Sequence, residues 1–222
     1  MALNKNKTDP VLGKKVNDYL TRKGINTPVN ESHLMKDSQE KIDLIQAHTR
    51  EIWTTLGMDL SDDSLIDTPK RIAKMFVDEL YWGLLPENFP KCTTIDNKMD
   101  YDEMIVEKDV TIMSNCEHHG VVIDGLARIG YIPNKKVLGL SKINRIADYF
   151  ARRPQVQERL TEQIFYALEY ILETSNVAVV VEATHYCVRS RGVQDYNSST
   201  KTSKLGGLFK EESALRMEFL QV

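Results

Sequence analysis

Two short runs of the sequence bring together side chains that bind metals and move protons. Three of the five histidines lie beside two of the three cysteines, within Cys116–His119 and His185–Cys187. Cys116 and His119 have the two-residue spacing with which a turn can direct a thiolate and an imidazole at one borderline-soft cation, and Cys187 offers a third ligand from a distant strand. The two runs therefore predict a metal site, and zinc suits these donors.

The size of this ligand set indicates what the metal would do. Three protein ligands leave one position of a tetrahedral zinc open, and a water bound there has a pKa of about 7. His118 and His185 then remain to donate and accept protons, since an imidazole titrates at about pH 6.5. Two alternatives stay open: a disulfide between Cys116 and Cys187, which a reducing compartment disfavours, and a closed structural zinc that uses four of the five residues.

The second run lies at the end of a β-branched stretch, residues 177–188, that predicts a strand. Alternate residues of a strand project from the same face. His185 and Cys187 are therefore expected on one face, roughly 6.6 Å apart along the backbone.

Basic residues gather where helices are expected to begin. Lys142 and Arg145 lie three apart in the first turn of a helix expected to start at Ser141, where backbone N–H groups, the helix dipole and fixed charge favour a phosphate. An exposed basic first turn is the more common explanation in general, but cations at this end oppose the dipole. With Arg71 and Arg191, they predict a polyanion near the metal.

A carboxylate and an amide open the helix that follows Pro154. Glu158, next to Gln157, could accept hydrogen bonds from a ring amide and an amino group such as those of guanine. Helix starts favour Glu in any case, so this signal is weak when taken alone.

The hydrophobic pattern predicts an α+β protein. Alternating β-branched residues predict strands at 104–113 and 121–132, with Asp124-Gly125 as a turn or bulge signal inside the second. Helical spacing predicts helices at 37–57, 68–80, 141–150, 155–172 and 213–220. Asp37, Thr68 and Ser141 are the expected N-caps of the first three. Residues 1–36 are polar and show only a short amphipathic helix.

Composition restricts the remaining possibilities. The 222 residues are 41% hydrophobic, enough for one substantial core, and their net charge of -3 gives no general attraction to nucleic acid. No apolar run reaches the length of about 18 residues that a membrane span needs, and the N-terminus has no apolar signal segment. A cytoplasmic protein without nucleic-acid or membrane partners is expected, with thiols rather than a disulfide framework.

Several ordered motifs carry a resemblance to a known family. They are Thr68-Pro69 with Arg71, Cys116–His119, Gly139–Ile146, Arg153–Leu160, His185–Cys187, Arg191-Gly192 and Leu205–Gly207. Together, over about residues 40 to 219, they resemble the GTP cyclohydrolase I family. This combination of motifs is highly specific.

The resemblance implies a role for each candidate residue. It implies that Cys116, His119 and Cys187 bind zinc, the only cofactor, and that His118 and His185 handle protons. It also implies a set of substrate-binding residues: Glu158 and Gln157 at the guanine edge, Ser141 near the ribose and phosphates, and Lys142, Arg145, Arg71 and Arg191 at the triphosphate.

The resemblance also implies a fold, an assembly and a reaction. The fold is the tunnelling fold, an antiparallel sheet with helices on one face, with sheets of several subunits joined into a barrel and extra N-terminal helices. The expected division is an appendage (1–37), a helical region (38–100) and a catalytic domain (101–222). The assembly is a homodecamer with active sites between subunits. The reaction is hydrolytic opening of the guanine imidazole ring of GTP, which gives formate and 7,8-dihydroneopterin triphosphate, the first step of tetrahydrofolate and pterin biosynthesis.

Two other functions compete with this prediction. Another enzyme of the same fold, such as a pterin synthase or a nitrile reductase, is disfavoured by the joint presence of the Cys/His set and the basic helix start. A zinc-stabilised nucleotide sensor would bind GTP without turnover. His118 and His185 would then be unnecessary, so their joint replacement by alanine discriminates between an enzyme and a sensor.

Overall fold

The computed structural model describes residues 3–221. Its centre is a five-stranded sheet in the order β5-β2-β3-β6-β7, in which β5 is parallel to β2 and the other neighbours are antiparallel. A smaller sheet pairs β1 with β4. The strands are β1 (Thr94–Asp96), β2 (Ile105–Cys116), β3 (Val122–Tyr131), β4 (Lys136–Leu138), β5 (Pro154–Gln155), β6 (Val177–His185) and β7 (Thr200–Leu205).

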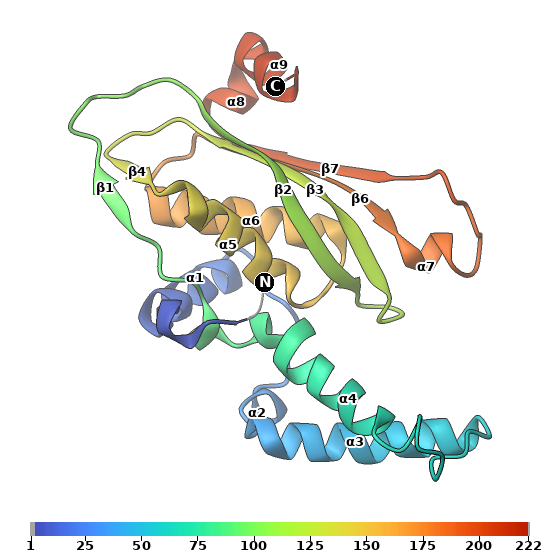
Figure 1. Ribbon diagram of the computed structural model, residues 1–222. Coiled ribbons are helices and arrows are strands. Elements are labelled where there is room, and N and C mark those ends of the chain that lie inside the picture. The colour runs from blue at the N-terminus through green and yellow to red at the C-terminus, as the bar shows by residue number, and fades with distance from the viewer. Residues whose placement is uncertain (1–2, 222) are drawn as a thin grey trace.

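Two long helices, α5 and α6, cover one face of the larger sheet (Figure 1). Ile146 of α5 and Ile164 of α6 are fully buried in one apolar core with Ile129 of β3. The α-helices are α1 (Pro10–Arg22), α2 (Glu31–Leu34), α3 (Ser38–Thr55), α4 (Thr68–Lys74), α5 (Leu140–Ala151), α6 (Gln157–Leu172), α7 (Tyr186–Arg189), α8 (Leu208–Glu211) and α9 (Ser213–Gln221). The other helical segments are the 3-10 turns η1 (Lys5–Lys7), η3 (Trp82–Leu84) and η4 (Pro86–Asn88) and the π-helix η2 (Met75–Leu80). Over residues 3–221, no helix combines the length and the apolar character needed to cross a membrane.

The opposite face of the sheet is covered only in part. Phe209 of α8 and Phe219 of α9 are buried against Val180, with their rings 5.3 Å apart. Elsewhere on this face, Met113 and Leu126 are 38% and 49% exposed. The expected α+β class is therefore confirmed, with helices mainly on one face of a sheet that is antiparallel except where β5 pairs with β2.

Helix starts were predicted to within one or two residues. Asp37 is the N-cap of α3, and its side chain accepts a hydrogen bond from the backbone N–H of Gln39 at 2.8 Å, as expected. Thr68 and Ser141, however, are not caps. Asp67 and Gly139 hold those positions, and no side-chain cap bond forms at either helix.

The expectation of a turn or bulge at Asp124-Gly125 was wrong. Both residues pair regularly with β2, and the irregularity lies in β2 itself, between Glu107 and Val110. A Cβ at position 125 would lie 2.2 Å from the Glu182 carbonyl oxygen of β6. The glycine therefore permits close approach of two strands rather than a change of direction.

Several strands were not predicted. β7 is a polar segment that pairs with β6 as an edge strand, and β1 and β4 span three residues each. Gln155 was expected to open a helix but belongs to β5, where it pairs with Cys116. α6 accordingly begins two residues later, at Gln157.

The amphipathic helix expected near the N-terminus is α1. Its N-cap Asp9 accepts a hydrogen bond from the backbone N–H of Leu12 at 2.9 Å. Val16 and Leu20 are each 1% exposed and belong to the main core. The Tyr19 hydroxyl donates to Glu169 of α6 at 2.7 Å, so this segment packs on the same helix that supports the sheet.

Candidate metal centre and active site

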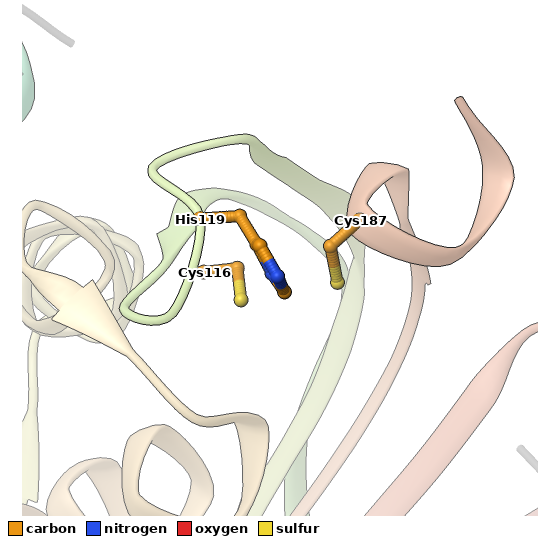
Figure 2. A group of neighbouring side chains, drawn as sticks. All are labelled: Cys116, His119 and Cys187. Carbon is orange, nitrogen blue, oxygen red and sulfur yellow. The ribbon is translucent and has the colours of Figure 1, made fainter. Parts of the chain in front are cut away.

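Two thiols and one imidazole converge at one end of the sheet. The ligand atoms of Cys116, His119 and Cys187 all lie within 4.8 Å of one another, and Figure 2 shows the three side chains grouped together. Cys116 is buried, Cys187 half-buried and His119 exposed. All three cysteines of the chain are free, so the disulfide alternative is not realised. The donor set fits a borderline-soft divalent cation.

The two sulfurs electrostatically favour such an ion. Burial raises the pKa of Cys187, and the nearby Cys116 raises it further by hydrogen bonding and charge, while Arg191 lowers it. Two adjacent thiolates repel each other unless a cation lies between them. A cation held between the two sulfurs would relieve that repulsion.

A tight turn between β2 and β3 places Cys116 and His119. The backbone N–H of Cys116 donates to Val121 O at 2.8 Å, and that of Gly120 donates to Cys116 O at 2.9 Å. Gly120 has φ +67°, a left-handed conformation that favours glycine. This residue lets the chain reverse within four residues of the buried cysteine and leaves His119 above its sulfur.

The strand expected to run through Cys187 was too long. β6 ends at His185, and Cys187 lies in the short helix α7. His185 and Cys187 therefore do not share a strand face. The helical turn directs Cys187 towards the β2–β3 turn instead.

His185 is held by a glutamine of α6. Gln157 Nε2 has three oxygen neighbours, Val181 O at 3.0 Å, Thr200 O at 2.9 Å and Thr202 Oγ1 at 3.1 Å. Since the carbonyl oxygens only accept, the NH₂ group must lie here, and Oε1 faces His185 Nε2 at 2.7 Å. His185 Nε2 therefore carries the donated proton, and Nδ1 is left to bind a second one.

The other proton-handling candidates lie close by. Burial lowers the pKa of His185, and the charge of Glu158 acts in the opposite direction, which places that carboxylate near the ring. His118 Nδ1 is 3.7 Å from Cys116 Sγ. His118 therefore lies beside the thiol pair, and Glu158 acts electrostatically on His185.

Arg191 also reaches this group. Its Nη1 lies 2.9 Å from His119 Nε2, although the two residues are 72 positions apart in sequence. The exposed guanidinium places positive charge at the open side of the centre. A phosphate or another anion bound there would find a partner.

Three other candidates lie at the far end of α5. α5 has 12 residues, so at about 1.5 Å per residue it spans roughly 18 Å. Its C-terminal end leads into β5, where Gln155 pairs with Cys116. Ser141, Lys142 and Arg145 belong to its N-terminal half, distant from the thiols.

The charges of this distant group act on a different cysteine. Burial raises the pKa of Cys92 to about 12, and Lys142 and Arg145 oppose that shift. Arg71 is separate again: it lies on α4, mostly exposed, 3.7 Å from Asp67. Within one chain, the candidate residues therefore do not form one site.

The sequence did not predict one ion pair beside the metal turn, the β2–β3 turn that carries Cys116 and His119. Arg159 of α6 forms an ion pair with Glu117, the residue between Cys116 and the two histidines. The acidic Glu117 inside the Cys116–His119 run was a signal that a basic partner should exist. Nothing in the spacing identified which of the many arginines it was.

The comparisons with known proteins point to one family. The family model for GTP cyclohydrolase I matches residues 45–222. The chain is 57% identical, over 206 residues, to GTP cyclohydrolase 1 of Shewanella sp. (strain W3-18-1), covering 93% of this chain and 95% of the relative. GTP cyclohydrolase 1 of Shewanella putrefaciens (strain CN-32 / ATCC BAA-453) gives the same values, and that of Shewanella baltica (strain OS185) is 56% identical with coverage of 93% and 94%.

Proposed function

Since this chain belongs to the GTP cyclohydrolase I family, we propose that it hydrolytically opens the guanine imidazole ring of GTP. The products are formate and 7,8-dihydroneopterin triphosphate, and the reaction is the first step of tetrahydrofolate and pterin biosynthesis. The observation that carries the proposal is the convergence of Cys116, His119 and Cys187 beside a histidine with a fixed tautomer. A protein that only bound GTP would not need that histidine.

Zinc is the metal proposed for the three-residue group. Two sulfurs and an imidazole nitrogen match the donors that zinc takes in catalytic sites with three protein ligands. When bound, zinc supplies Lewis acidity and lowers the pKa of water in its open position. Cys116, His119 and Cys187 would hold it.

The protons are moved by the neighbouring histidines. Water adds at C8 of guanine, and His185 delivers a proton to the adjacent ring nitrogen while Gln157 holds the opposite side of its imidazole. The C8–N9 bond then breaks, a second hydration releases formate, and the ribose carbons rearrange and close onto the freed amines. His118, near Cys116, is the second histidine proposed to handle protons.

The first turn of α6 binds the guanine edge. Glu158 accepts hydrogen bonds from the ring amide and the exocyclic amino group, and its charge acts on the neighbouring His185. Gln157 contributes to this edge through His185, because its own NH₂ group is already bonded to three protein oxygens.

The triphosphate is bound between copies of the chain. Ser141, Lys142 and Arg145 of one copy, with Arg71, complete the site that the metal residues and Arg191 of a neighbour begin. The distance along α5 supports this division of the site. A homodecamer is the assembly that the family resemblance implies.

Exposed apolar surface supports such an assembly. Ile52 and Leu56 of α3 are 59% and 71% exposed, and Leu126 lies on the open face of the sheet. In the assembly, residues 101–222 form the tunnelling-fold domain, whose sheets join into a barrel, and residues 38–100 form the helical region. Residues 1–37 form the N-terminal appendage, which packs on the main core through Val16 and Leu20. A cytoplasmic location, without nucleic-acid or membrane partners, agrees with the free cysteines.

The experiment that tests the function uses purified, metal-analysed protein incubated with GTP, with and without a chelator. Formate and, after oxidation, a fluorescent pterin are expected, and both should disappear when the chelator removes the zinc. GTP that binds but survives in the presence of stoichiometric zinc would refute the proposal and favour a sensor.

A further inference from the structure

The turn that carries the proposed metal ligands projects from the end of β2 into solvent. Cys116 is buried at the end of β2, but His118, His119 and Gly120 are exposed. A turn that projects into solvent needs contacts with a rigid neighbour if His119 is to stay over the Cys116 sulfur.

Glu117 provides that contact. Both of its carboxylate oxygens face Arg159, with Nη1 on Oε2 and Nη2 at 3.4 Å from Oε1. The side chains are only 20% and 25% exposed, for Arg159 and Glu117 respectively. A half-buried pair with two contacts holds its partners in orientation better than an exposed single contact does.

Arg159 itself starts from a rigid base. It lies in the first turn of α6, where Gln157 is bonded to Val181 and Thr200 of the sheet. The backbone N–H of Glu117 also donates to Gln155 O at 3.0 Å, two residues before that turn. The metal turn is thus tied to the start of α6 by both its backbone and its side chain.

The order of residues in that turn of α6 adds a functional meaning. Gln157 holds His185, Glu158 is the proposed guanine-binding carboxylate, and Arg159 reaches Glu117. Three consecutive residues of one helical turn thereby contact the proposed proton donor, the substrate and the turn that carries the metal ligands. Their relative positions are set by one rigid element.

We infer that Arg159 is a positioning residue that holds the metal-ligand turn in its binding geometry through Glu117. The inference rests on the proposed metal site at Cys116, His119 and Cys187. It assigns Arg159 no contact with the substrate or with the metal.

The test measures zinc affinity of the full-length protein by competition with a chromophoric chelator, for Arg159→Met, Arg159→Lys and Glu117→Gln. Positioning predicts that both Arg159→Met and Glu117→Gln weaken zinc binding, on the order of tenfold. Arg159→Lys, which keeps the charge but not the fork of two donors, should lie between. If the two residues acted only through their charges, the two variants would change zinc affinity in opposite directions. Glu117→Gln would weaken the binding of a cation, and Arg159→Met would strengthen it.

The chain offers a matched control on the same helix. Glu162 of α6 pairs with Lys204 at 3.0 Å, with side-chain exposures of 35% and 30%, and neither residue touches the metal turn. Glu162→Gln should leave zinc affinity unchanged while it changes the melting temperature of the metal-free protein about as much as Glu117→Gln. If Arg159→Met does not fold, Glu117→Gln and Arg159→Lys still decide the question.

Either of two results would overturn the inference: zinc affinity that is unchanged or increased in Arg159→Met, or a loss of affinity that Glu162→Gln shares. These results leave the proposed function intact if the wild-type protein binds zinc and releases formate from GTP. Wild-type protein that binds no zinc would overturn both, so the two failures are distinguishable.

Discussion

A complementation experiment tests whether the site is shared between copies of the chain. Cys187→Ser removes a proposed metal ligand, and Lys142→Ala removes a proposed phosphate-binding cation in the N-terminal half of α5. About nine residues of α5, roughly 14 Å at about 1.5 Å per residue, separate Lys142 from the C-terminal end of the helix, which leads to β5 beside Cys116. If the two residues serve different halves of a shared site, a mixed oligomer recovers activity that neither variant has alone.

The size of the recovery follows from counting. In a randomly mixed assembly at equal amounts, each half of a site is wild type half the time, so about a quarter of the sites are intact in both halves. The assay mixes the two variants under conditions that exchange subunits, or co-expresses them, and measures formate released from GTP. About a quarter of wild-type turnover is expected.

The control mixes two variants of the same half, Cys187→Ser with His119→Ala. Every site in that mixture lacks one ligand, so no activity should return. If the first mixture also stays inactive, although subunit exchange is verified with differently tagged chains, the shared site is refuted. The metal and phosphate residues would then have to meet within one chain, against the distance along α5.

Three further predictions concern single residues. Cys187→Ser should lose both zinc and turnover, measured by metal analysis and formate release, because two ligands cannot retain the ion; normal activity would disprove the ligand set. Gln157→Leu should lower the free energy of unfolding by about 2 kcal/mol, at about 1 kcal/mol for each of the two N–H donors that the three oxygens share. It should also reduce turnover, because the His185 ring loses its partner. Denaturant melts and formate release measure the two effects, and unchanged turnover would contradict the positioning of His185. Cys92 should resist alkylation at pH 8 in the native protein, since its pKa is raised from 9.0 to about 12, and peptide mass spectrometry should find it modified only after unfolding. Because the unfolded thiol ionises first, stability should fall as the pH rises from about 9 towards 12, and Cys92→Ala should lose that part of the slope.

The elements predicted best from sequence are those with one fully buried apolar face. α6 and α5 carry isoleucines and leucines at helical spacing, and these side chains are buried in the core as expected. β2 and β3 follow the alternating pattern for the same reason. Burial against a single layer leaves a periodic signal that can be read without knowledge of the neighbours.

The missed strands lack that signal. Thr200–Leu205 is polar because β7 lies at the sheet edge, and its pairing depends on β6 rather than on its own composition. β5 has two residues and begins with Pro154, which reads as a helix boundary. Its importance comes from its position beside Cys116, which no local pattern reveals.

The candidate site divides in the same way. Residue types were sufficient to select Cys116, His119 and Cys187, because clustered thiols and imidazoles are typical of metal sites. Spacing was not sufficient to place them, and it gave no information on the separation of Lys142 from the thiols. That separation depends on the direction in which α5 crosses the sheet, which is a property of the whole fold.

The early end of β6 explains how neighbouring residues acquire different tasks. A strand continuing through Cys187 would place its sulfur beside His185 on one face, roughly 6.6 Å away. Instead, α7 begins at Tyr186, and the backbone N–H of Ser190 donates to Tyr186 O at 2.9 Å to close a helical turn. His185 stays at the end of the sheet, bonded to Gln157, while Cys187 turns towards Cys116. One turn of helix thus separates His185, the histidine proposed to move protons, from Cys187, the cysteine proposed to hold the metal.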